Sequence, residues 1–514
     1  MKIPPNAIDK LIGYLSPAAG LRRMNARRAL SQYEAAQPSR MRKLHRDQRS
    51  PDLQVQQGAV AIRTQARNLE QNHDIARGAL RTLVNNVIGP TGIGIEPQPR
   101  RKDGSINAEY AKALRDAWRN WCLCPEVTQR HHWAKVQRML AKTWFRDGEA
   151  FTQSLIGQIP MLDHGTRVPF SLEMFEPDMV PMEYTDAGKG IRQGIQRNTW
   201  GKPTGYYVWK SFPIDISTTL TRPNDLKFIE ASRILQLASL DRIGQMRGVS
   251  EFASVITRLE DIKDYEESER IAAKVAAALT AYVKKGSPDL YDTQTQVLRD
   301  SEGNALPREL SLSPGTIIDN LSVGEEIGLI DSNRPNPNLI TFRSGQLRAI
   351  AAGLGASYSS LARDYNGTYS AQRQELVEQW IHYAILTDEF VGQFVQPVWQ
   401  QFVQAAHLSG VVRMPADLEQ YSEDDCLFVG QSMPWIDPLK EASAWHQLTQ
   451  DGFASEVEVI RKRGGNPRDV IEQIAAFRKD AADKKLVFGS DFANSNQAST
   501  GQQADPAPAD GQQN

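Results

Sequence analysis

A long amphipathic pattern runs from residue 250 to residue 284. Apolar side chains recur there at helical spacing, and no proline or glycine interrupts them. The pattern predicts one long helix that begins at Ser250, whose hydroxyl can accept a hydrogen bond from a free backbone N–H. A helix of this length needs partners for its apolar stripe, either in its own domain or in neighbouring subunits. The stripe residues expected to pack in this way are Leu259, Ile262, Ile271, Val275 and Leu279.

Further helical patterns follow a turn-rich stretch. A shorter helix is predicted for residues 339–352, and it ends near two glycines, which suit a helix C-terminus. A second long helix is predicted for residues 371–406, with a kink at Pro397, which lacks the N–H that a helix interior needs. Between these helices lies a polar loop.

Residues 437–484 are predicted to form a small helical unit. Asp437 and Asn466 are capping residues followed by proline. Ser455 with Glu458 matches a capping box.

The part of the chain before residue 250 mixes both periodicities. Residues 61–88, 107–121 and 132–147 have helical spacing. Residues 150–237 are predicted to form several short strands, such as EAFTQSLI, separated by proline and glycine turns. Together with the helices described above, these segments predict an α+β fold.

The two ends of the chain differ in composition from the rest. The first fifty residues hold eleven Lys and Arg but only three Asp and Glu. They predict a basic, partly disordered arm, which either contacts a polyanion or an acidic partner surface, or is simply a solvated terminus. Residues 486–514 have few large apolar side chains and are predicted to be disordered. The candidate contact residues of the arm are Arg22, Arg23, Arg27, Arg28, Arg42 and Lys43.

The charge balance limits what kind of partner the surface can hold. The chain has 60 Lys and Arg against 61 Asp and Glu, a formal net charge of −1. A protein that grips nucleic acid with its whole surface carries a clear positive excess, so this class is disfavoured. Three cysteines cannot form a disulfide framework, which favours a reducing compartment. No stretch approaches the about 18–20 apolar residues of a membrane span.

The candidate catalytic and metal-binding patterns are weak. Cys122 and Cys124 precede His131, but the spacing differs from that of the usual zinc sites. Asp163 and His164 could form half of a hydrolytic dyad, yet the sequence has no GxSxG turn and no GxxxxGK[ST] phosphate loop. We therefore predict no catalytic residue, no cofactor site and no metal site. An enzyme would need carboxylates gathered from distant segments.

Several segments, in order, resemble one known family. RAIAAGLGASYSSLARDYNGTYSAQRQEL (348–376) is the most specific, followed by SLDRIGQMRGVSEFASVITRLEDIKDYEES (239–268) and LSPGTIIDNLSVGEEI (312–327). These segments resemble the lambda-type portal proteins of tailed bacteriophages, and the resemblance spans roughly residues 60 to 485. The chain departs from the family pattern at Ala371 and Gln372. We expect the loop to persist there with different side-chain contacts.

The resemblance implies a portal fold with a mixed α/β wing, a helical stem, a small β-containing clip and a helical crown. The implied segments are a basic arm (1–59), the wing (60–248), the first stem helix (250–284), the clip (285–336), the second stem helix (338–354), the tunnel loop (355–370), a kinked wing helix with a return strand (371–435), the crown (436–485) and a disordered tail (486–514).

The resemblance also implies a structural rather than an enzymatic function. Portal proteins form rings, usually of about twelve subunits, at one capsid vertex, through which double-stranded DNA is packaged and ejected. The implied partners are the terminase large subunit, capsid and scaffold proteins, and head-completion or tail connector proteins. The implied location is the virion, after assembly in the host bacterial cytoplasm. The alternative is a metal-dependent nuclease of a phage or prophage, which predicts magnesium-dependent cleavage instead of an annular oligomer.

Within this frame the tunnel loop is the expected DNA contact. A conduit must let DNA slide, so its lining should be polar but not strongly basic. Arg363 and Asp364 nearly cancel in charge. An ordinary surface loop is the alternative interpretation. The candidate channel residues are Tyr358, Arg363, Asp364, Tyr365, Asn366, Thr368 and Tyr369.

Overall fold

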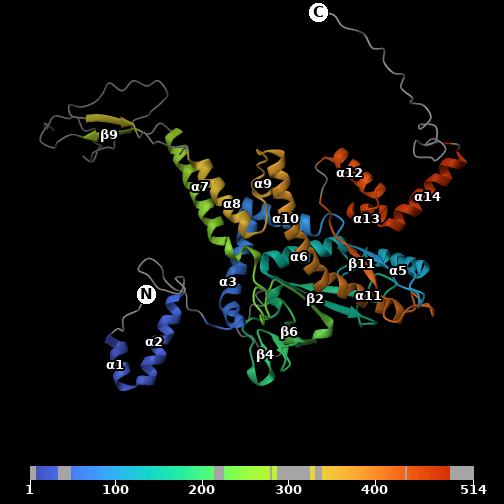
Figure 1. Ribbon diagram of the computed structural model, residues 1–514, viewed down its shortest axis with the longest axis horizontal. Helices are drawn as coiled ribbons and strands as arrows, with labels where there is room; N and C mark the ends of the chain where they lie inside the picture. Colours follow the sequence, from blue (N-terminus) through green and yellow to red (C-terminus); the bar gives the residue numbers. More distant parts are fainter. Residues whose placement is uncertain are drawn as a thin grey trace, which may run out of the picture. The chain divides into compact units, whose positions relative to one another are not determined.

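The computed structural model describes residues 7–32, 48–213, 225–277, 281–285, 325–329, 338–433, 437–484 and 486 (Figure 1). The chain divides into two compact units, Met1–Gln54 and Val55–Asn514. The first unit is described first, and the elements described after it belong to the second unit. Among the described helices, none is long and apolar enough to cross a membrane.

The first unit contains helices where the sequence predicts a partly disordered arm. Helix α1 covers Ala7–Leu15 and α2 covers Pro17–Gln32. Arg23 Nε donates to Asp9 Oδ1 at 2.8 Å, and this ion pair joins the two helices. Arg22 is exposed, while nothing is described of the side chains of Arg27 and Arg28. Arg42 and Lys43 lie outside the described residues.

The helices of the second unit enclose an aromatic core. Its first four helices are α3 (Pro51–Asn72), α4 (Asp74–Val87), α5 (Ala108–Trp121) and α6 (Trp133–Asp147). The pattern predicts one helix over 61–88, but His73 ends α3 and caps α4, and its Nδ1 accepts from the backbone N–H of Ile75. Trp118 and Trp121 stack with ring centroids 4.6 Å apart, and Phe402 packs edge-on against Trp118. This cluster ties α5 to a helix nearly 300 residues later in the sequence.

The strands form two main antiparallel sheets. In the first, β2 (Glu149–Ile156) lies between β3 (Phe170–Phe175) and β8 (Ile234–Ala238). The second has the order β4 (Ile191–Arg192), β5 (Ile195–Arg197), β6 (Pro203–Trp209) and β7 (Leu226–Glu230). A third pairing, β1 (Gly94–Pro97) with β11 (Cys426–Val429), brings together two segments that are far apart in the sequence.

The predicted first stem helix is shorter than its apolar pattern. Ser250 does cap the start, because its Oγ accepts from Phe252 N, but the first turn is a 3₁₀ turn, Glu251–Ser254. Helix α7 covers Ile256–Ala277, and the prediction of helix to residue 284 is wrong. Strand β9 (Ala281–Lys285) takes its place and pairs with β10 (Glu325–Leu329). Its Tyr-Val pair is of residue types that favour strands. Most of the expected clip, 285–336, lies outside the described residues.

The predicted second stem helix and the long helix after it occur in the predicted order. Helix α8 covers Leu339–Gly353, and α10 covers Tyr369–Phe390. A π-helical turn, Val391–Val395, joins α10 to α11 (Gln396–Leu408) directly before Pro397. The helix is irregular near Pro397, where a kink was predicted. A π-helical turn occurs there because its wider spacing relieves the contact between the proline ring and the preceding carbonyl.

The last helices are α12 (Pro438–Gln450), α13 (Glu456–Lys462) and α14 (Pro467–Asp483). Asp437, Ser455 and Asn466 cap them with side-chain oxygens, as the sequence predicts. These helices are bound to the body by ion pairs from Arg461 to Glu96 and from Arg115 to Asp469.

Candidate functional site: the loop between α8 and α10

The segment after α8 turns sharply at Gly355. Its φ of +62° is a left-handed conformation, and an added Cβ would lie 2.4 Å from the ring of His382. Only glycine fits this turn. Burial lowers the pKa of His382 below its ordinary value, although the charge of Glu389 acts in the opposite direction, so the ring is neutral at pH 7.

The predicted tunnel loop contains a short helix that the sequence interpretation missed. Helix α9 covers Tyr358–Ala362, and Ser357 caps it by accepting from Ser360 N at 3.2 Å. Leu361 is 8% exposed and packs into the main core. This leucine anchors α9, so the irregular parts of the predicted loop are the turn before α9 and the residues after Ala362. The signal available in the sequence was the serine cap before an apolar residue.

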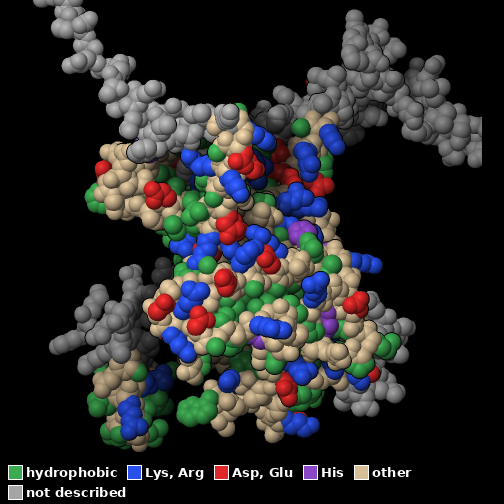
Figure 2. All heavy atoms as spheres, turned by 90° about the vertical axis from the view of Figure 1, so that its right-hand side faces the viewer, with side chains coloured by type: hydrophobic (Ala, Val, Ile, Leu, Met, Phe, Trp, Pro, Cys, Tyr) green, Lys and Arg blue, Asp and Glu red, His purple; other side chains and the backbone are tan. Residues whose placement is uncertain are grey.

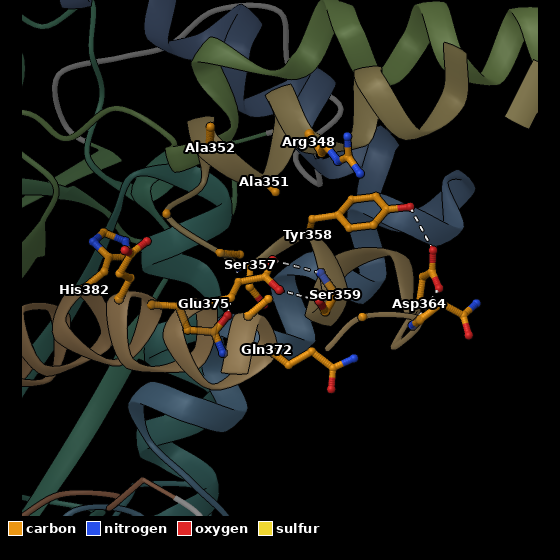
Figure 3. A pocket seen from close by; sticks show the side chains of 17 residues that line it. Arg348, Ala351, Ala352, Ser357, Tyr358, Ser359, Asp364, Gln372, Glu375 and His382 are labelled. Carbon is orange, nitrogen blue, oxygen red and sulfur yellow. Dashed lines mark hydrogen bonds between the residues drawn. The ribbon is translucent and has the colours of Figure 1, made fainter. Parts of the chain in front are cut away.

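Two of the predicted channel residues face inward instead. Tyr358 Oη donates to Asp364 Oδ2 at 3.1 Å and lies 3.2 Å from Ser344 Oγ (Figure 3). The guanidinium of Arg348 lies over the Tyr358 ring, 5.1 Å from its centroid. Asp364 also accepts from the backbone N–H of Asn366. These contacts make the half-buried Tyr358 and Asp364 parts of the loop's support, and their place in a channel stays a prediction.

Helix α10 holds the loop from the other side. The carboxylate of Glu375 accepts from the backbone N–H of Ser359 at 3.2 Å and also from its hydroxyl. Gln379 Oε1 accepts from Ser357 N at 2.8 Å, and Gln372 donates to the carbonyl of Tyr365. Figure 3 shows Ser357, Ser359 and Glu375 meeting in a pocket of about 750 Å³ between α8, α9 and α10. The sequence interpretation did not identify these α10 residues.

Glu375→Ala is expected to release α9 from α10. The amide of Ser359 should exchange with solvent about 10–100-fold faster, because a hydrogen bond to a charged group contributes about 1.5–3 kcal/mol. Hydrogen exchange of residues 357–362, followed by mass spectrometry or NMR, measures this. Glu378→Ala is the matched control, since Glu378 accepts from Gln374 on its own helix. Equal exchange in both variants would contradict the anchoring role.

The remaining predicted loop residues form an exposed tip. Tyr365 is 57% exposed and Tyr369 is 51% exposed. The polar residues beside them offer donors and acceptors but little net charge. The tip residues, all exposed, are Arg363, Tyr365, Asn366, Thr368 and Tyr369.

The predicted stem residues fall into different environments. Leu259 and Ile262 are 0% and 2% exposed and lie in the main core. Ile271, on the same predicted stripe, is 54% exposed. The side chain of Val275 and the whole of Leu279 lie outside the described residues. Helix α7 contacts α8 through an ion pair between Glu266 and Arg343 and through the rings of Tyr265 and Phe342, 5.0 Å apart.

The weak chemical patterns of the sequence have structural roles. His164 bonds Ser171 Oγ and the Gly157 carbonyl, both at 2.8 Å, while Asp163 accepts from the Gly165 amide, so the two do not form a dyad. Burial raises the pKa of the Cys122 thiol, which makes it unreactive. Within the described ranges, no group of three or more His, Cys, Asp or Glu side chains could hold a metal ion.

A buried charge cluster joins strand β2 to the segment that precedes α7. Arg247 and Glu149, both 0% exposed at the side chain, form an ion pair at 2.7 Å. Arg247 also donates to the carbonyls of Val180 and Gln193, and Glu149 accepts from the amide of Gly248. Arg247 and Gly248 belong to the 239–268 segment that resembles portal proteins. The segment therefore fixes the start of α7 to the sheet that contains β2.

The comparisons with known proteins agree with these segments. The family described as "Phage portal protein, lambda family" matches residues 37–386. A probable portal protein of Halomonas phage phiHAP-1 is 24% identical over 424 residues, which are 80% of this chain and 79% of that protein. Portal protein B of Escherichia phage lambda is 22% identical over 443 residues, covering 79% of this chain and 81% of that protein.

One solved structure with a similar arrangement is a chain from the neck of an empty gene transfer agent particle, at a TM-score of 0.43 and 11% identity. It covers 78% of this chain and 94% of that chain. Nothing in these comparisons supports the nuclease alternative. The family match covers more than half of the sequence, and portal proteins are structural components of virions rather than enzymes. The chain therefore belongs to the lambda family of phage portal proteins.

Proposed function

We propose that copies of this chain close into a ring, of about twelve subunits, at one vertex of a capsid. Double-stranded DNA passes through the channel of this ring during packaging and ejection. The tip of the tunnel loop is the part of each subunit that lies nearest to the DNA. The observation that carries this proposal is the exposed tip itself, which presents two tyrosines, Arg363 and two uncharged polar side chains from a base anchored by hydrogen bonds.

The charge of the chain fits a conduit better than a clamp. Each phosphate contact adds salt-dependent affinity, and a ring multiplies every lining residue by its number of subunits. A strongly basic lining would therefore hold the DNA in place. The net charge is −1, and in Figure 2 basic and acidic side chains are interspersed on the face that is drawn.

The partners follow from the same proposal. The sequence has no GxxxxGK[ST] loop, so the packaging motor is a separate protein, the terminase large subunit. The clip, residues 285–336, is the proposed dock for this motor and later for head-completion or tail connector proteins. The basic arm, with Arg22 and Arg23 exposed on α2, is the proposed contact for capsid or scaffold proteins or for DNA. Assembly takes place in the host bacterial cytoplasm.

Tyr365→Ala combined with Asn366→Ala tests the role of the tip. Rings should form as in the wild type, because both side chains are exposed and α9 stays anchored by Leu361. Retention of DNA in filled heads should fall at least about tenfold, because the contact is lost in every subunit of the ring at once. The yield of filled heads and their nuclease-protected DNA are the measurements.

The matched control is Trp200→Ala, which removes an aromatic side chain that is 93% exposed in a wing turn. It should leave both ring formation and DNA retention unchanged. Normal genome filling and retention by the tip variant would mean that the loop is an ordinary surface loop.

A further inference from the structure

Helix α10 is apolar on two opposite faces. Tyr383 and Phe390 are 1% and 0% exposed and face the core. Ile381 is rotated by about 200° from Tyr383 around the helix axis, and it is 61% exposed. Val377 and Ile385, one turn to either side, are 38% and 54% exposed. A helix with apolar residues all round is normally buried on all sides, so this outer face needs a partner.

Acidic side chains accompany these apolar residues. Glu378 and Asp388 are both exposed on α10, and Asp388 has no ion-pair partner within the described residues. We call the set of Val377, Glu378, Ile381, Ile385 and Asp388 the α10 ridge. Its partner should offer an apolar floor with basic edges.

A groove of this kind lies between α4 and α6. Its volume is about 230 Å³, and the side chains that line it include Leu80, Val84 and Met139. Arg77, Arg81 and Lys135 stand at its edges and are all exposed. In the described part of the chain none of these three basic side chains has an ion pair. We call this surface the α4–α6 groove.

The groove and the ridge face opposite ways. Asn86 on α4 and Thr387 on α10 line one pocket with Tyr383, and Thr387 Oγ1 donates to the Val87 carbonyl at 3.0 Å, so this side of α4 faces α10. Around α4, Arg81 and Arg77 are rotated by about 140° and 180° from Asn86. The two helices therefore form a layer. Its outer face on α10 is acidic and apolar, and its opposite outer face on α4 is basic.

We infer that the α10 ridge of one subunit docks into the α4–α6 groove of the next copy of this chain. Two complementary surfaces on opposite sides of a subunit make a head-to-tail contact, which closes into a ring when the rotation between copies allows it. Burial of the ridge isoleucines supplies apolar contact, while Glu378 and Asp388 meet Arg81 and its neighbours. This inference rests on the ring that we propose above, and it names the surfaces that form it.

Two single variants, each lacking one surface, provide the test. Ile381→Asp removes the apolar centre of the ridge, and Arg81→Glu reverses the charge of the groove edge. Each variant alone should lose ring assembly at least about 100-fold in association constant and remain folded, because both side chains are exposed in the subunit. When the two are mixed, the intact ridge of Arg81→Glu fits the intact groove of Ile381→Asp. Only a one-to-one heterodimer should form.

Native mass spectrometry of the full chain reads out every outcome, and circular dichroism checks the fold. Met161→Asp and Arg130→Glu are the matched controls, since both residues are exposed elsewhere in the wing and should leave rings intact. Wild-type rings together with rings of either test variant would overturn the inference and leave the ring proposal standing. Two monomeric variants that fail to form a heterodimer would also overturn it. Rings of Arg81→Glu that lose DNA would reassign the groove to DNA. A monomeric wild type would instead overturn the ring itself.

Discussion

Replacing Arg247 with methionine is expected to lower the free energy of unfolding by about 3–5 kcal/mol, the cost of leaving one charge of a buried pair without its partner. The Arg247 side chain is completely buried, and its only ion-pair partner among the described residues is Glu149, equally buried. Methionine fills much of the same volume but donates no hydrogen bond. The carbonyls of Val180 and Gln193 therefore lose a donor at the same time.

Arg63 reduces the loss of stability expected for Arg247→Met but does not remove it. Its Nη2 lies 3.3 Å from Glu149 Oε1, so the carboxylate keeps one positive neighbour. Urea unfolding of wild type and variant, followed by circular dichroism, measures the difference at unchanged m-value. Arg130→Met is the control, because Arg130 is exposed and its loss should change stability by less than about 0.5 kcal/mol. A similar small change for Arg247→Met would mean that the attachment of the segment before α7 to β2 does not depend on this pair.

Local sequence patterns correctly predicted those helices and strands whose ends are determined by residues next to them in the sequence. Strand β2 was predicted as EAFTQSLI, the same eight residues that the structure assigns, because the glycines at 148 and 157 mark its two ends. The caps Asp437, Ser455 and Asn466 were predicted for the same reason. The end of α7 was missed because its apolar spacing continues to Val283, and helical spacing over one turn does not exclude a strand. Pairing with β10, more than forty residues later, decides between them.

The candidate site shows the same division between local and distant information. The polar pattern predicted a loop between α8 and α10, and the resemblance suggested its role, but neither indicated the direction of its side chains. Asp364 was paired with its neighbour Arg363 on charge, whereas the structure places it against Tyr358. Glu375 gives no local signal of its role, since its contact with Ser359 exists only after α9 folds back onto α10. Contacts of this kind depend on tertiary packing.

Leu259→Asp is expected to lower the free energy of unfolding by at least about 4 kcal/mol, whereas Ile271→Asp should change it by less than about 0.5 kcal/mol. Both residues belong to one predicted stripe of α7, so sequence alone treats them alike. Leu259 is 0% exposed, and its carbonyl lies 2.9 Å from Nε2 of buried His73. An aspartate there would lose the apolar contacts of the leucine and place a carboxylate in the core. Ile271 is 54% exposed, so water can solvate an aspartate at that position.

The two variants therefore separate the stability of the subunit from that of the ring. Thermal unfolding should show a large loss for Leu259→Asp alone. Native mass spectrometry should show that Ile271→Asp forms fewer rings from well-folded subunits, because an apolar side chain exposed in one copy is available to bury against the next. Loss of subunit stability in Ile271→Asp would mean that its helix packs within one chain. Full ring assembly by a stable Ile271→Asp would mean that the outer half of α7 contributes nothing to contacts between subunits.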